Sequence, residues 1–501
     1  MRMWKQYQER YRAFWSRNPA LFLGLSLLLG NSIAFHFYPC LVVAFLVLLL
    51  TAKSRRSFIL SIVCFSAAFF NASYRYPKVT LSEEKLAGVG VFHIEEVKHS
   101  SSPFQKSLLY KGTLKTFETG EGITFNNLPC QIYLPLFGKR PSANIDYKIQ
   151  GALCQKGDHA FVLKPGKNIP WAPLLPSFNL AEWRFCAKQA VARYLKKHIT
   201  DPHARTLFIA LTTGEIDERI LSMEFGKVGL QHLLAISGFH FALAALFLGL
   251  VLRLLLPGKW SIFLLIAALS CYYLFLGGAP SIQRAYIAIV LFAIGQFFSL
   301  KISGLNALGA GLIAEMLLSP FSVTLLSFQL SFLCTLAILM FYPIVNQLLA
   351  FIFPERTYSE VKEMSLLDKH GALLSRLLRQ MLSLNLSVHL ISLPVLLYLF
   401  HKFPLLSLSY NLFFPPCITL SMLLFFVALF LAPIPPLSHM IHALNNAWTS
   451  AILNLTTNPP AFLDSCIRTK ALSFSWVIVF LIGAFFLGIF FHEKQRKEIQ
   501  S

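Results

Sequence analysis

The sequence predicts a polytopic α-helical membrane protein with a small β-rich domain inserted after its first helices. Of its 501 residues, 55% are hydrophobic and 13% are charged, and several apolar runs approach the ~20 residues that a helix needs to cross a bilayer. Between residues 71 and 200 these runs give way to short alternating segments broken by Gly, Pro and Asn, which are typical of strands.

The apolar runs predict about twelve membrane crossings. The second run is short and the eleventh is amphipathic. They cover residues 20–35, 38–50, 58–70, 230–256, 262–276, 282–300, 305–318, 325–353, 381–400, 405–431, 437–455 and 473–491.

Basic residues beside these runs predict the orientation, because short segments rich in Lys and Arg stay in the cytoplasm. We therefore expect both termini in the cytoplasm and residues 71–200 outside it. A cleaved signal peptide is the less favoured alternative, because two more hydrophobic runs follow at once without a small-residue cleavage site. The flanking basic residues are Arg2, Lys5, Arg10, Arg12, Arg17, Lys53, Arg55 and Arg56, with further ones in the tail at 492–501.

The exported segment predicts a small β-barrel or sandwich. A Pro-rich connector at 169–176 follows it, and then a basic amphipathic helix at 182–198 whose apolar side is expected to lie on the membrane. The expected strands are residues 88–97, 108–117, 131–136, 144–152 and 160–163.

The exported segment is also basic, with 18 Lys and Arg against 9 Asp and Glu, which gives it +9 of the net charge of +21. A translocated domain of this length is exempt from the positive-inside bias. Its charge therefore predicts a polyanionic partner, either DNA or anionic lipid headgroups. The candidate DNA contacts are Lys139, Arg140, Lys148, Lys156, Lys164 and Lys167.

The nine cysteines form no pair with zinc-ligand spacing, so neither a metal site nor a cofactor is predicted. Cys130 and Cys154 lie on separate expected strands of the exported segment. An oxidising compartment would allow a disulfide between them, and the sequence leaves this bridge and two free thiols equally open.

Residues 229–240, with the sequence GLQHLLAISGFH, form the most informative motif because they place ionisable and polar groups in an apolar run. A continuous helix would carry one polar arc facing a hydrated path and an opposite arc of small residues packed on a neighbouring helix. A Ser-Gly pair can also kink or unwind such a helix. The polar arc holds His232, Ile236, Ser237 and His240, and the small arc holds Ala235, Gly238, Ala242 and Ala245.

Arg284 is the strongest single candidate for a channel-lining residue. A cation near the bilayer centre costs ~2.5–3.5 kcal/mol unless it is paired or hydrated. Asn306, Gln329 and Asn411 are weaker candidates, because amides commonly join helices. The alternative interpretation is that all these groups serve helix packing and that Arg284 reaches the interface. Their number and the motif at 229–240 favour a conduit.

The motif resembles the signature of the ComEC competence proteins, Gly-x-x-His-Leu-Leu-Ala-Ile-Ser-Gly-Leu-His, with Phe239 where Leu is usual. Residues 177–179 resemble the joint that follows the outer domain of this family, which is described as OB-like. Further matches, in chain order, are ALTTGE at 210–215, PSIQRA at 280–285, Asn306, Ser-Pro at 319–320, SFQLSF at 327–332, Leu-Pro at 393–394, Phe-Pro at 403–404, Asn411 and Pro-Pro at 415–416.

The resemblance implies a channel in the bacterial inner membrane that translocates single-stranded DNA into the cytoplasm during transformation. It implies membrane lipid as surroundings and a separate DNA receptor, nuclease and cytoplasmic motor as partners. The expected domains are N-terminal transmembrane helices at 1–70, an OB-like extracytoplasmic domain with its connector and amphipathic helix at 71–200, a channel domain at 201–491 and a basic cytoplasmic tail at 492–501.

Many members of this family continue into a metallo-β-lactamase-like domain, but the sequence holds neither an HxHxDH cluster nor a GxxxxGK[ST] loop. We therefore expect no catalytic residues and no enzyme. One alternative is an intramembrane serine hydrolase that uses Ser237 and His240, although a GxSxG elbow is missing. Another is a transporter of lipids or envelope precursors.

Overall fold

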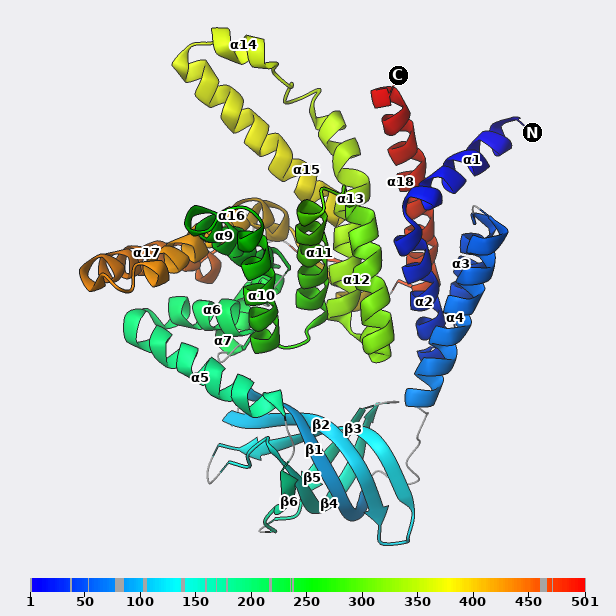
Figure 1. Ribbon diagram of the computed structural model, residues 1–501, viewed down its shortest axis with the longest axis vertical. Helices are drawn as coiled ribbons and strands as arrows, with labels where there is room; N and C mark the ends of the chain where they lie inside the picture. The colour runs from blue at the N-terminus through cyan, green and yellow to red at the C-terminus, as the bar shows by residue number, and fades with distance from the viewer. Residues whose placement is uncertain are drawn as a thin grey trace.

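Helices formed by the apolar runs make up one layer of the molecule, and a β-barrel lies below them (Figure 1). Both chain termini lie on the side of the helical layer that faces away from the barrel. The computed structural model describes residues 2–500 except 37, 53, 77–84, 102–105, 137–139, 158–159, 168, 177–178, 216–218, 235, 237, 460–465 and 471.

Four helices begin the chain: α1 (Arg2–Arg17), α2 (Pro19–Phe35), α3 (Pro39–Leu50) and α4 (Arg55–Arg75). The axis bends by 95° between α1 and α2. Asn18 and Pro19 stand at this bend, where proline suits the first turn of a new helix.

Glycines allow α2 to pack closely between α4 and α12 (Gly304–Leu318). A Cβ atom on Gly309 of α12 would lie 2.2 Å from the backbone nitrogen of Leu21. A Cβ atom on Gly30 would lie 2.3 Å from the carbonyl oxygen of Phe65 on α4. Small residues that bring backbones together are the usual basis of helix packing in membranes.

The barrel contains six strands, of which five close on themselves. β1 pairs with β2 and β4, β2 with β3, β3 with β5 and β5 with β4, and the β3–β5 pairing is parallel. The inward side chains, which include Phe92, Tyr110 and Ile132, are fully buried. The strands are β1 (Leu86–Ser101), β2 (Lys106–Thr119), β3 (Thr124–Pro135), β4 (Ile145–Gly157), β5 (Ala160–Pro165) and β6 (Ala172–Pro176).

The five strands and the helix expected from the sequence are confirmed. The expectation that the apolar side of this helix lies on the membrane is wrong, because Ala181 and Phe185 pack in the barrel core and Leu195 packs in a buried cluster of the helical layer. The helix is α5 (Leu180–His198), which packs against β1 and leads back to the helical layer. The strand β6 was missed because it lies in the Pro-rich connector. It pairs with β4 at the edge of the sheet, where proline is tolerated.

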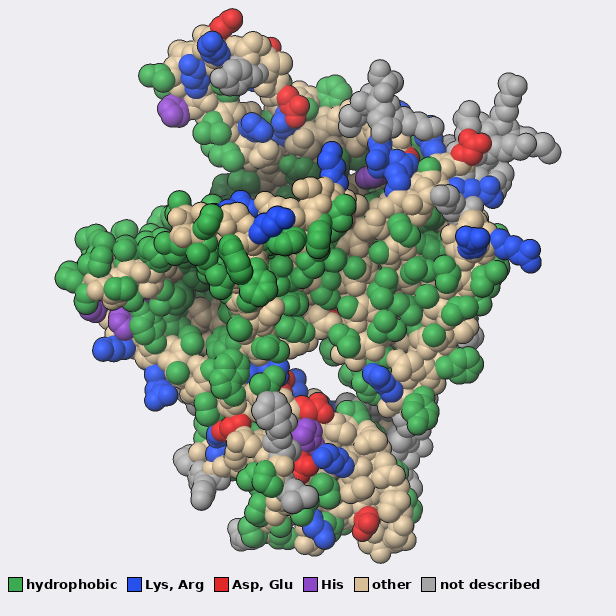
Figure 2. Space-filling model, in the orientation of Figure 1, with side chains coloured by type: hydrophobic (Ala, Val, Ile, Leu, Met, Phe, Trp, Pro, Cys, Tyr) green, Lys and Arg blue, Asp and Glu red, His purple; other side chains and the backbone are tan. Residues whose placement is uncertain are grey.

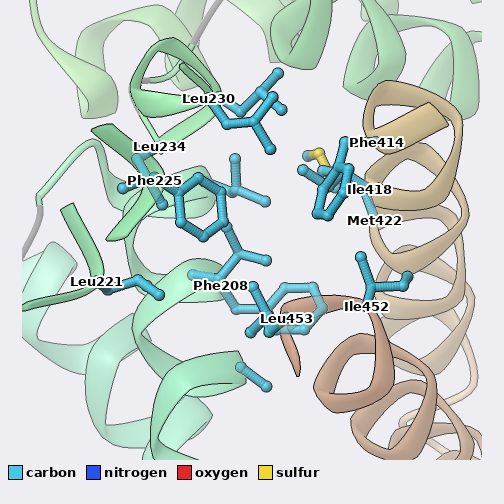
Figure 3. Close-up of a cluster of buried hydrophobic side chains, with 14 of the residues drawn as sticks. Phe208, Leu221, Phe225, Leu230, Leu234, Phe414, Ile418, Met422, Ile452 and Leu453 are labelled. Atoms are coloured by element: carbon cyan, nitrogen blue, oxygen red, sulfur yellow. The ribbon is translucent and has the colours of Figure 1, made fainter. Parts of the chain in front are cut away.

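A buried cluster joins the segment after α5 to the C-terminal helices (Figure 3). Phe208, Phe225 and Leu234 meet Ile418 and Leu453 across this cluster. The elements on the first side are α6 (Pro202–Thr213), α7 (Arg219–Lys227) and α8 (Gln231–Leu234), and those on the second are α16 (Leu406–Phe430) and α17 (Pro435–Thr457).

The remaining elements complete the helical layer. The two short strands β7 and β8 form a ribbon beside the end of α15. The remaining elements, in chain order, are α9 (Gly238–Leu255), α10 (Lys259–Leu276), α11 (Pro280–Phe297), η1 (Pro320–Thr324), α13 (Leu326–Leu349), α14 (Tyr358–Glu363), α15 (Leu366–Phe400), β7 (Lys402–Pro404), β8 (Cys466–Arg468) and α18 (Phe474–Gln500).

The apolar runs are helical as expected, but fewer helices than twelve qualify as spans. Among the described residues, seven helices are long and apolar enough to cross a membrane, or eight if α1 and α2 count as one bent span. The helices α3 and α12 are apolar but short, and α11 and α17 are not among the seven. Hydrophobic side chains cover the helical layer (Figure 2), as expected for a multi-pass membrane protein.

Cys130 and Cys154 are free thiols, so the possible disulfide between them is not formed. The strand β5 lies between them, since Cys130 pairs with Phe161 and Cys154 with Val162. Two strand spacings separate the cysteines by about 10 Å, which exceeds the reach of a disulfide. Neighbouring residues of β5 also point to opposite faces, so the two thiols do as well.

The close contact between α2 and α12 predicts that Gly309→Ala destabilises the helical layer. The added methyl group meets backbone rather than a movable side chain, so we expect a loss of roughly 1–3 kcal/mol. Thermal unfolding of the purified chain in detergent measures this effect. Gly483→Ala on α18 is the matched control, because nothing lies within 4 Å of its Cβ position. Equal melting temperatures for the two variants would contradict the packing argument.

Candidate functional site

The motif at 229–240 forms a break between two helices. The helix α8 ends at Leu234 and α9 begins at Gly238, and Ile236 between them is buried but not helical. The continuous helix expected over 230–256 is therefore wrong, and the two arcs derived from it do not apply. Ser237, the predicted polar residue of the motif, and Ala235 lie outside the described residues.

A neighbouring helix satisfies the backbone that this break exposes. The carbonyl oxygen of Ile236 accepts a hydrogen bond from Ser281 Oγ at the start of α11, at 3.1 Å. An unsatisfied carbonyl in hydrocarbon would be costly, and irregular backbone at membrane depth is tolerated where protein or water surrounds it. The break is thus a built feature of the helical layer, held by the PSIQRA segment at 280–285.

Arg284 lies at the junction of the break with three other helices. Its Nε donates to Ser331 Oγ on α13 at 3.1 Å, and its guanidinium carbon lies 5.9 Å from the ring centroid of Phe332. A Cβ atom on Gly238 would lie 2.7 Å from Arg284 Nη2, and one on Gly311 of α12 would lie 3.6 Å from Arg284 Cγ. Glycine at 238 therefore makes room for the guanidinium, whereas a side chain at 311 would make an ordinary van der Waals contact with Arg284.

Among the described residues, Arg284 has no carboxylate partner. Its side chain is half-buried. A guanidinium in a membrane protein needs water, a partner or an anion to offset desolvation. Ser331 supplies one acceptor, and none of the other described residues accepts a hydrogen bond from the guanidinium, which suits an oxygen-rich group.

Three histidines on separate helices gather near the break. His240 is buried in the first turn of α9, and His232 on α8 is exposed. His232 lies within electrostatic range of His240 and of His389 on α15. His389 Nδ1 bonds with the carbonyl oxygen of Asn385 at 2.8 Å. The sequence analysis missed His389, although it is an ionisable residue in the apolar run at 381–400 and the argument used for Arg284 would have found it.

The three predicted amide residues have other partners. Asn306 Nδ2 donates to the carbonyl oxygen of Arg17 at 2.7 Å and ties α12 to the bend after α1. Gln329 Nε2 donates to the carbonyl oxygen of Val323 at 2.9 Å. Asn411 Nδ2 donates to Ser407 Oγ at 2.9 Å within α16. These contacts fit the alternative interpretation, in which amides hold helices and turns together.

Basic residues of α5 join the barrel side of the molecule to the helical layer. Arg184 Nε donates to the carbonyl oxygen of Leu274 at 2.6 Å, and Lys188 Nζ to that of Leu276 at 3.2 Å. Both cations therefore bind the C-terminal end of α10, where a helix favours positive charge. Burial lowers the pKa of Lys188, while Glu215 of the ALTTGE segment, 3.6 Å away, opposes the shift.

The predicted DNA contacts on the barrel fall into two groups. Lys148 and Lys156 on β4, Lys164 on β5 and Lys167 after it are exposed. None of these four lysines forms an ion pair with a described residue. Lys139 lies outside the described residues.

Arg140 is engaged, in contrast to these lysines. Its guanidinium forms a two-pronged ion pair with Glu182 on α5 and lies 4.4 Å from the ring centroid of Phe185. The Ala143 N–H donates to the same carboxylate at 2.8 Å. Arg140 therefore holds the barrel to α5, a role that its basic character alone did not indicate.

Within the described part of the chain, no group of three or more His, Cys, Asp or Glu residues could hold a metal ion. The three histidines at the break therefore do not converge as ligands. Each imidazole can instead donate or accept hydrogen bonds.

Comparisons with known proteins agree with the motif. A family model described as "Competence protein" matches residues 212–494. ComE operon protein 3 of Bacillus subtilis (strain 168) is 27% identical over 241 residues, which cover 46% of this chain and 27% of the relative. The match thus spans about a quarter of the length of that relative. No solved structure is significantly similar.

The contact between Arg140 and Glu182 predicts a pH-dependent stability. Burial would raise the pKa of Glu182, but hydrogen bonds from Arg140 and the Ala143 N–H outweigh burial and lower it. The carboxylate therefore stabilises the folded chain fully above its ordinary pKa, and this stabilisation is lost as pH falls through the lowered value.

The melting temperature of wild type should exceed that of Glu182→Gln near pH 7, and the difference should shrink toward about pH 3. The exposed Glu118, changed to Gln, serves as the control. A difference that stays constant with pH would show that Glu182 acts through packing rather than through its charge.

Proposed function

Because the chain belongs to the competence protein family, we propose that it forms the inner-membrane path by which single-stranded DNA enters a bacterial cell. The observation that carries the proposal is the broken helix beside Arg284. A cation without a carboxylate partner among the described residues, at a break in a membrane helix, suits the passing phosphates of a nucleic acid strand.

The proposed path needs groups that bind phosphate briefly and without regard to sequence. Arg284 offers its guanidinium fork, and His232, His240 and His389 offer imidazoles that exchange partners readily. Gly238 at the start of α9 lets the backbone approach the arginine closely, since a Cβ atom there would lie 2.7 Å from Arg284 Nη2. Each contact is weak enough to be released, which a conducting path requires.

The barrel is proposed to collect the strand on the outer side. Its strand order, with β1 closing on β4 and β3 parallel to β5, supports an OB-like identity, and OB folds bind oligonucleotides elsewhere. Lys164 lies opposite Ala152, midway along β4 between Lys148 and Lys156. Lys148, Lys164 and Lys156 thus form a lysine row in which neighbours are about 13 Å apart along the strand direction. Such a row would attract a phosphate backbone.

The proposed orientation places the barrel outside the cytoplasm and both termini inside it. The termini lie on the side of the helical layer away from the barrel (Figure 1), and basic residues flank the first and last helices. A receptor that delivers DNA, a nuclease that makes the single strand and a cytoplasmic motor would be separate proteins in this scheme.

Uptake of labelled DNA tests the role of Arg284. We expect Arg284→Gln to abolish the fraction of label that external nuclease cannot reach while surface-bound label persists. Arg284→Lys should retain part of the uptake, because lysine keeps the positive charge but lacks the planar guanidinium that can bind two oxygens at once. Arg253→Gln is the matched control, since this exposed arginine at the end of α9 bonds with Gln296 on the helix surface. Unchanged protection in Arg284→Gln would exclude a role for this charge in translocation.

The lysine row predicts salt-dependent binding of DNA by the full chain. Changing Lys148, Lys156 and Lys164 to Gln should weaken binding of an oligothymidine strand and reduce the slope of log affinity against log salt by about 2. The control changes Lys301, Lys362 and Lys369 to Gln, which removes equal charge elsewhere. Fluorescence anisotropy measures both. The same slope for the two triple variants would place the DNA contacts away from the barrel row.

A further inference from the structure

A cavity of about 540 Å³ lies between the N-terminal helices and the rest of the helical layer. Side chains of α2, α3, α12, α13, α15 and α18 line it, and nearly all of them are apolar. Ligand sites of about 300–1,000 Å³ with apolar walls and a few polar groups are typical for small molecules. An apolar cavity does not hold water well, so a hydrocarbon occupant suits it better.

The cavity is elongated along the helices. Its lining runs from Leu21 to His36 on α2, about 22 Å of helix, and from Phe474 to Phe486 on α18, about 18 Å. One leaflet of a bilayer holds acyl chains over roughly 15 Å. The cavity is therefore long enough for one acyl chain that lies parallel to the helices.

The two ends of the cavity differ in polarity. Ser32, His36, Gln329 and Tyr398 line the end toward the barrel, where Tyr398 lies 5.9 Å from Phe474 between ring centroids. The other end is lined by apolar side chains of Leu21, Met340, Phe341 and Phe486. A molecule with a polar head and a hydrocarbon tail matches this gradient.

Three exposed cations lie close in the chain, or across the β7–β8 ribbon, to residues that line the polar end. Lys402 follows the lining residue Tyr398 by four positions in the chain. It lies opposite Arg468 in the antiparallel β7–β8 ribbon. Lys470 precedes the lining residue Phe474 by four positions, and all three cations are exposed. Residues 396–404 and 466–476 contain no Asp or Glu. The charge at this end is therefore suited to an anion.

We infer that the cavity is a binding site for an anionic phospholipid of the outer leaflet. One acyl chain would fill the space between α2, α13 and α18, and the phosphate would lie near Lys402 and Lys470. Basic pockets between transmembrane helices bind anionic headgroups by the same combination of charge and burial. The lipid would join the N-terminal helices to the channel helices, and this role does not depend on DNA transport.

Native mass spectrometry of the full chain in mild detergent, titrated with dioleoyl phosphatidylglycerol, tests the site. We expect one retained lipid per chain in wild type. Ile478→Trp should abolish this retention, because Ile478 lines the cavity and a larger side chain would occupy it. Val479→Trp is the matched control, since Val479 is the next residue on α18 and points outward with 60% of its surface exposed. Equal retention by these two variants would overturn the site.

The headgroup is tested separately, with variants that change exposed residues and leave the core intact. Wild type should retain dioleoyl phosphatidylglycerol in preference to dioleoyl phosphatidylcholine, and the pair Lys402→Gln and Lys470→Gln should abolish this preference. The pair Lys301→Gln and Lys362→Gln should keep it. Equal retention of both lipids by wild type would overturn the anionic specificity, and loss of preference in both pairs would show that charge acts at a distance rather than at this site.

Discussion

The cost of leaving polar groups unsatisfied in hydrocarbon governs the arrangement of the helical layer. At the break before Gly238, the chain gives up helical hydrogen bonds, and Ser281 of α11 binds the exposed carbonyl of Ile236. The same region holds Arg284 against Ser331. Each polar group therefore requires a particular neighbouring helix, and the positions of α9, α11 and α13 follow from these pairings.

Charged side chains of α5 join the barrel to the helical layer. Glu182 on α5 binds Arg140 from the barrel, while Arg184 and Lys188 on the same helix bind carbonyl groups at the end of α10. The helix α5 thus binds the barrel through an acidic residue and the helical layer through basic residues. A movement of the barrel relative to the helices would have to break these charge-assisted contacts.

The helical layer combines tight and loose packing. Glycines bring α2 into backbone contact with α4 and α12, whereas the space between α2, α13 and α18 is left as a cavity. Both arrangements suit a membrane, where close approach of backbones replaces the hydrophobic effect as the force between helices and lipid tails are available to fill gaps. Among the described helices, α2 is thus tightly packed on its side toward α4 and α12 and loosely packed on its side toward α13 and α18.

The sequence by itself determined the class of the protein, the barrel strands, the helix α5 and the family motif, because these depend on local periodicity and composition. It also predicted a role for Arg284, since a cation in an apolar run is costly wherever the run lies. Only the tertiary structure decided that α8 and α9 are separate, that β5 keeps Cys130 from Cys154, that Arg140 is engaged with Glu182 and that His389 comes near His232. These features depend on contacts between segments far apart in the chain, which no local pattern encodes.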